Sequence, residues 1–132
     1  TGSSTLSGLA GGSINFTITS KINNPPDSVG DNSRSADYGD SIVFTGADFT
    51  SATIPAYNDP EGDAAYQVKI LTLPSSGSLM INGNSVGANY TILISEINAG
   101  YLVFNPDLGI TTTTVLTFEF AVSDIGSKTF TT

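Results

Sequence analysis

Apolar and polar residues alternate with a period of two along several short stretches of this 132-residue chain. The clearest stretch is residues 116–122, in which every second residue is large and apolar: Leu116, Phe118, Phe120 and Val122. Successive side chains of a β-strand point to opposite faces, so this pattern predicts a half-buried strand. Since no segment shows a sustained period of 3.6 residues, the sequence predicts an all-β chain.

Turn signals separate the predicted strands at intervals of roughly 8–12 residues. Asn82-Gly83 is a strong tight-turn signal, and residues 95–100 read as a single helical turn that Ser95 can cap and Gly100 can end. Residues 46–57 read as an irregular loop. Further strands are expected at residues 14–18, 42–45, 66–73, 78–81, 90–94 and 101–104, and at the C-terminal end. Short alternating strands with regular turns are typical of an antiparallel β-sandwich, which we therefore predict.

An acidic turn at residues 58–64 stands directly before one of the longest strand patterns. Asp59, Glu61 and Asp63 occupy every second position, with Pro60 and Gly62 between them. Proline fixes φ and glycine permits unusual φ, so a tight turn is predicted here that draws the acids together. Calcium takes six to eight oxygen ligands, and two or three carboxylates with amide or backbone oxygens would suffice. The alternative is a solvated acidic surface turn.

The composition disfavours several functions. Twelve acidic residues against four basic ones give a net charge of −8, which disfavours binding to the phosphates of nucleic acid. The chain has no His and no Cys, so the usual catalytic triads, thiol chemistry and imidazole or thiolate metal sites cannot form. A carboxylate pair for glycoside hydrolysis is conceivable, but there is no Trp to provide a sugar platform. We therefore predict a protein that is not an enzyme. No apolar run approaches the roughly 20 residues of a membrane span.

The N-terminal part of the chain differs from the rest. Residues 1–12 are rich in Gly, Ser and Thr, and then Ile14, Phe16 and Ile18 alternate with polar residues. Pro25-Pro26 lacks N–H donors and ends the pairing. We therefore predict two parts: a flexible segment with one strand and a linker at residues 1–24, and a sandwich module at residues 25–132. The chain begins with Thr1 and ends within a strand-like pattern, as expected of a piece of a longer protein.

Two outcomes are open for the apolar strand at residues 13–20. It packs against its own sandwich, or it completes a sheet in a neighbouring module or subunit by strand addition. Its alternation matches that of residues 118–124, either by chance or because it is the closing strand of a preceding repeat. We predict head-to-tail association in which Ile14, Phe16 and Ile18 contact the partner.

Several motifs follow one another in a specific order between Asn24 and Asp124. They are the entry Asn24-Pro25-Pro26, the acidic Asp59-Pro60-Glu61-Gly62-Asp63, residues 73–79 with Asn82-Gly83, residues 96–106, and the closing residues 118–124. Through these motifs the chain resembles a bacterial cadherin-like, immunoglobulin-like tandem repeat. Such repeats occur in large surface adhesins and in fibre or other structural proteins of bacteriophages. The pattern departs from the family at Glu96, where many repeats have Asp, and at Ser20, where a preceding module would offer Asp.

The resemblance implies an immunoglobulin-like sandwich and a calcium site near the junction of successive modules. Carried over by position, the ligands would be Asp59, Glu61, Asp63 and Asp124. The function implied is a non-catalytic structural repeat of an extracellular appendage, surface adhesin or virion fibre. Its partners would be neighbouring repeats or identical subunits. The alternative is an adhesive module whose loops bind a glycan or protein of a host surface.

Overall fold

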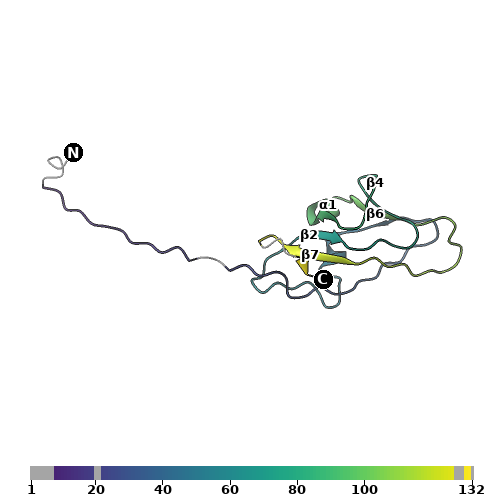
Figure 1. Cartoon of the computed structure of the whole chain (residues 1–132), viewed down its shortest axis with the longest axis horizontal. Coiled ribbons are helices and arrows are strands. Elements are labelled where there is room, and N and C mark those ends of the chain that lie inside the picture. Colours follow the sequence, from purple (N-terminus) through teal and green to yellow (C-terminus); the bar gives the residue numbers. More distant parts are fainter. Residues whose placement is uncertain (1–7, 20–21, 127–129, 132) are drawn as a thin grey trace.

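A computed structural model describes residues 8–19, 22–126 and 130–131 of the chain. Most of the chain forms a body of β-strands, from which the N-terminal segment projects as an extended tail (Figure 1). The elements, in chain order, are β1 (Ile42–Val43), η2 (Gly46–Phe49), β2 (Ala65–Ile70), β3 (Ser78–Ile81), β4 (Asn84–Ser85), β5 (Tyr90–Leu93), α1 (Ile94–Asn98), β6 (Leu102–Asn105), β7 (Phe120–Asp124) and β8 (Phe130–Thr131). The prediction of an all-β chain is confirmed. Among the described residues, no helix has the length and apolar character needed to cross a membrane.

The strands form two antiparallel sheets of four strands each. One has the order β1-β6-β3-β4 and the other the order β5-β2-β7-β8. In the second sheet Val68 of β2 lies between Ile92 of β5 and Val122 of β7. The hairpin between β3 and β4 turns at Asn82 and Gly83, whose φ angles of 49° and 82° are both positive. This is the tight turn that the Asn-Gly pair predicts.

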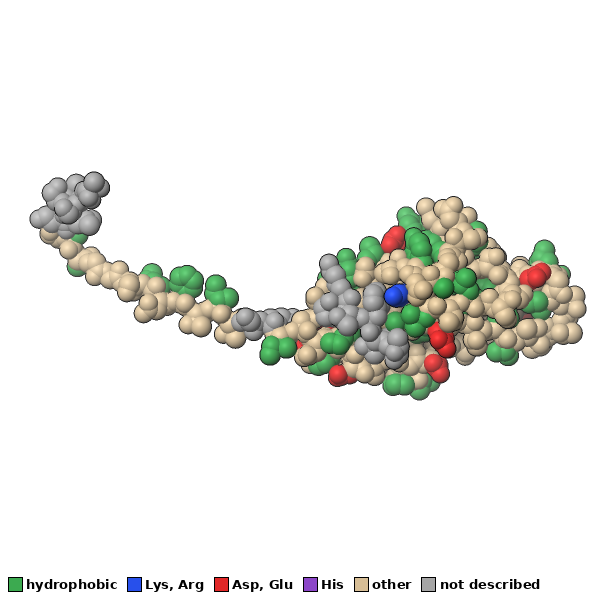
Figure 2. Space-filling model, viewed as in Figure 1, with side chains coloured by type: hydrophobic (Ala, Val, Ile, Leu, Met, Phe, Trp, Pro, Cys, Tyr) green, Lys and Arg blue, Asp and Glu red, His purple; other side chains and the backbone are tan. Residues whose placement is uncertain are grey.

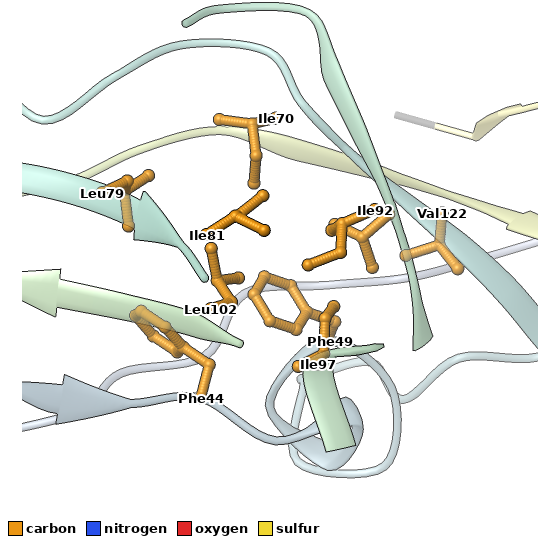
Figure 3. Close-up of a cluster of buried hydrophobic side chains, with 10 residues drawn as sticks. Phe44, Phe49, Ile70, Leu79, Ile81, Ile92, Ile97, Leu102 and Val122 are labelled. Carbon is orange, nitrogen blue, oxygen red and sulfur yellow. The ribbon is translucent and has the colours of Figure 1, made fainter. Parts of the chain in front are cut away.

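The hydrophobic core lies between the two sheets (Figure 3). It receives buried side chains from both sheets, from η2 and from α1: Phe49, Val68, Ile70, Leu79, Ile81, Ile92, Ile97, Leu102 and Val122. The ring of Phe49 lies 5.7 Å from Phe44, 6.2 Å from Phe118 and 4.9 Å from Phe120, measured between centroids. This aromatic cluster joins η2 to the strand region around β7, so it connects elements that are far apart in the sequence.

One local prediction was wrong, and another was right in the element but not in its cap. Residues 46–57 were expected to be an irregular loop, but the segment begins with η2, which buries Phe49 in the core. The predicted helical turn is present as α1, and Gly100 follows it with a φ of 86°, but its cap differs: the turn begins at Ile94, and the Glu96 carboxylate accepts the backbone N–H of Leu93 at 3.1 Å. A glutamate reaching back in this way satisfies a backbone donor at the helix start without a serine cap.

Strand β7 begins at Phe120, four residues after the predicted start at Leu116. The reason lies in its partner, since β2 ends at Ile70. Beyond that point the backbone of Glu119 accepts the N–H of Leu71 at 2.8 Å but donates to the side-chain hydroxyl of Thr72 at 2.9 Å. The regular ladder therefore stops although the alternating pattern continues.

Residues 13–19 are extended and do not pack against the chain's own sheets (Figures 1 and 2). Ile14, Phe16 and Ile18 are 89%, 80% and 85% exposed. The structure therefore does not show the first of the two outcomes, in which this segment packs on its own sandwich. Strand addition to a partner stays a prediction.

Candidate metal centre

Three of the four predicted ligands gather at one place. Asp59, Asp63 and Asp124 each offer a carboxylate oxygen, and these oxygens lie within 4.8 Å of one another. The first two belong to the loop before β2, and Asp124 is the last residue of β7. Two members of the group are buried, since Asp59 is 7% exposed and Asp124 is fully buried, whereas Asp63 is half-buried.

The acidic loop is a turn built around the side chain of Asp59. Its Oδ1 accepts the backbone N–H of Glu61 at 2.9 Å and that of Asp63 at 3.0 Å. Its backbone carbonyl accepts the N–H of Gly62 at 3.1 Å, and Gly62 has a φ of 78°, a conformation that favours glycine. The tight turn predicted from Pro60 and Gly62 is therefore present, and it brings Asp63 back beside Asp59.

The pairing of β2 with β7 supplies the third carboxylate. Ala65 lies opposite Asp124, and the register then shifts by an irregularity between Ala65 and Gln67. The backbone N–H of Ile125 also donates to the carbonyl of Ala64 at 3.2 Å. Such bulges bend a strand and redirect its side chains. Here the irregularity lies beside Asp124, where the end of β7 meets the acidic loop.

One of the two carboxylate oxygens of Asp59 has no hydrogen-bond partner among the described residues. This oxygen, Oδ2, is buried. An unsatisfied buried carboxylate oxygen is costly, and three carboxylates so close together repel one another. Calcium–oxygen distances of 2.3–2.6 Å place opposite ligands at most about 5 Å apart, and the 4.8 Å limit of this group lies within that span. The residues present therefore fit a calcium ion.

Glu61, the fourth predicted ligand, lies outside this group. Its carboxylate accepts the backbone N–H of Asn24 at 2.6 Å and the side-chain amide of the same residue at 3.2 Å. The preceding residue, Asn23, donates its amide to both oxygens of Asp124, at 3.1 and 3.3 Å. Asn23 and Asn24, which precede Pro25, thus connect the entry segment to the end of β7 and to the acidic loop. A role of Glu61 as a ligand stays a prediction.

Sequence reasoning missed Asn23 and Tyr57 as neighbours of the acids. The signal for Tyr57 was its position just before the acidic turn. Its hydroxyl donates to the backbone carbonyl of Asp63 at 2.9 Å. Burial raises the pKa of Tyr57 to about 12, and the negative charges of Asp59, Asp124 and Asp63 add to this effect.

The raised pKa of Tyr57 predicts a loss of stability at high pH. Unfolded tyrosine ionises near pH 10, whereas the folded group stays neutral until about pH 12. Between these values the unfolded state releases its proton first, so the free energy of unfolding falls as the pH rises. Melting temperatures measured from about pH 9 to about pH 12 should therefore fall less steeply for Tyr57→Phe than for the natural chain. The control is Tyr38→Phe, at a 67% exposed tyrosine; parallel curves for all three proteins would contradict the prediction.

No family model, curated protein or solved structure matches this chain. Its function is therefore inferred from its own residues and their geometry.

Proposed function

We propose that this chain is a non-catalytic structural module of immunoglobulin-like, cadherin-like type, stabilised by calcium held by Asp59, Asp63 and Asp124. It would serve as a repeat of an extracellular appendage, surface adhesin or virion fibre. The observation that carries the calcium site is the buried, unpartnered Oδ2 of Asp59 within a group of three carboxylates. A resident cation satisfies that oxygen and neutralises the group's repulsion.

The position of the three acids supports a structural role for the ion. It would join the loop before β2 to the end of β7. Asn23 and Asn24 bind Asp124 and Glu61, so the same region also receives the entry segment. A cation at this site would therefore stabilise the junction between the module and the segment of chain that precedes it.

The composition supports a function without catalysis. The chain offers no imidazole and no thiol. The carboxylates that do gather are ligand-like, because Asp59 is largely buried and its Oδ1 is occupied by two backbone N–H groups. Turnover of a polysaccharide or peptide by the purified protein, abolished by one carboxylate substitution, would contradict this part of the proposal.

A second candidate function is an adhesive module. Tyr38 and Leu108 are 67% and 65% exposed, and the tyrosine hydroxyl donates to the backbone carbonyl of Leu108 at 2.8 Å. This pair presents apolar side chains from two loops that are distant in the sequence. Binding of a host-surface glycan or protein to these loops, independent of calcium, would favour this function.

Calcium is expected to raise the melting temperature of the protein. A ligand that binds only the folded state stabilises it by about 2.7 kcal/mol at a concentration 100 times its Kd. Calorimetry in chelator and in a calcium series measures the effect, and an equal ionic strength of potassium chloride controls for screening of the net charge. A transition that is the same in chelator and in calcium at low ionic strength would refute the calcium site.

A further inference from the structure

We propose that the side chain of Asn89 is an acceptor for N-linked glycosylation. The inference goes beyond the proposed structural function and does not depend on the calcium site. Two observations carry it. The sequence Asn89-Tyr90-Thr91 matches the acceptor pattern Asn-X-Thr, and the structure places these residues in an exposed turn at the start of β5.

The acceptor pattern is short, so its position in the fold has to support it. It requires an asparagine, then any residue except proline, then serine or threonine, and it is used where it lies on the surface. In this sequence only Asn15 and Asn89 meet it. Asn15 lies in the extended tail, whose apolar residues we expect to contact a partner. Asn89 lies within the body, far from both ends of the sequence, and its neighbours in the chain are all described.

Residues 87–91 form a continuous exposed stretch between two anchored positions. On one side the backbone N–H of Val86 donates to the carbonyl of Leu79 at 3.1 Å, and on the other side Ile92 is buried in the core. The space beside the stretch is open, since a Cβ atom built on Gly87 would meet no atom within 4 Å. A glycan attached to Asn89 would therefore extend into solvent without displacing part of the body.

The fold fixes the backbone of Asn89 and leaves the reacting groups free. Its φ of 67° lies in the left-handed region, which asparagine adopts more readily than most residues, and its backbone N–H donates to the carbonyl of Ile70 at the end of β2. By contrast, the Asn89 side-chain amide and the Thr91 hydroxyl make no hydrogen bond with the described residues. Both side chains that the pattern requires are therefore accessible to a transferase, and modification would break no interaction of the described fold.

The reaction is the transfer of a glycosyl group to the amide nitrogen of Asn89. The donor is a glycosyl diphosphate, either a nucleotide sugar or a lipid-linked oligosaccharide. The bond between the anomeric carbon and the diphosphate oxygen breaks, and the diphosphate leaves with the electron pair. Nδ2 forms the new bond to the anomeric carbon and loses one proton to the transferase. This chain supplies only the acceptor, and no oxidation or reduction takes place.

Mass spectrometry of the protein purified from its native source tests the proposal. The peptide that contains Asn89 should carry the additional mass of a sugar, and fragmentation should place that mass on Asn89. A single hexose would identify a nucleotide sugar as the donor, whereas a preassembled oligosaccharide would identify a lipid-linked donor. A peptide without added mass, or a sugar attached to Asn15 alone, would overturn the inference.

Three substitutions, expressed in the same cells, make the test specific. Thr91→Val removes the hydroxyl but keeps a β-branched side chain suited to a strand, and it should abolish the modification. Thr91→Ser keeps the hydroxyl and should retain the modification. Asn89→Gly removes the acceptor and tolerates the positive φ, so this variant should fold and stay unmodified. Equal modification of Thr91→Val and the natural chain would overturn the inference. The calcium response is measured separately, so the failure of either proposal leaves the other standing.

Discussion

Asp59→Asn is expected to lower the melting temperature of the protein in calcium and to raise it in chelator. The amide oxygen of asparagine can still accept the N–H groups of Glu61 and Asp63, so the turn is kept. The atom that changes is Oδ2, which is buried and unpartnered. In calcium the variant loses a charged ligand. In chelator it gains an N–H donor that faces two carboxylates and loses one of three mutually repelling charges.

The expected size follows from mass action. If calcium at about 100 times its Kd contributes about 2.7 kcal/mol, loss of binding removes most of that stabilisation. A domain of this size shifts its melting temperature by about 4 °C per kcal/mol, so a difference of roughly 10 °C between the two proteins in calcium is expected. Differential scanning calorimetry in chelator and in calcium measures both expected changes in melting temperature, the increase in chelator and the decrease in calcium.

Two further variants make this experiment specific. Asp37→Asn removes the same charge at an exposed residue outside the group of three acids, and should keep the full calcium response. Glu61→Gln tests the fourth predicted ligand, because its carboxylate binds Asn24 in this structure. If Asp59→Asn responds to calcium as strongly as Asp37→Asn, the three acids are not the site.

Phe49→Ala is expected to cost about 3–5 kcal/mol of folding free energy, the range for truncating a buried aromatic residue. Phe49 is 2% exposed and contacts three other aromatic rings. Its removal leaves a cavity where η2 meets the strands, and the neighbouring rings can fill it only in part. Urea unfolding of the natural chain and the variant gives the difference from the two midpoints.

The matched control for this substitution is Phe16→Ala. It removes the same side chain from a residue that is 80% exposed, so its free energy of unfolding in dilute solution should change by less than about 0.5 kcal/mol. Equal losses from the two variants would mean that η2 does not pack in the core as described.

The sequence by itself determined the local structure of most of the body. Alternation of apolar and polar residues indicates which face of a strand is buried. This pattern located β2, β3, β5 and β6 within a few residues. Asn82-Gly83 and the turn of Asp59 to Gly62 were also predictable, because positive φ angles are a property of the residues themselves. These features depend on contacts between residues that are close in the chain.

Only the tertiary structure decided which acids meet. Asp59, Glu61 and Asp63 are equivalent in the sequence, yet two of them face Asp124 and the third faces Asn24. The choice depends on the register between β2 and β7 and on the path of the linker, which join residues far apart in the chain. The same holds for Phe49, since its loop has no periodic pattern, and for the start of β7, which depends on where β2 ends. Local sequence encodes backbone conformation and the buried face, whereas distances between separate segments arise only when the two sheets pack.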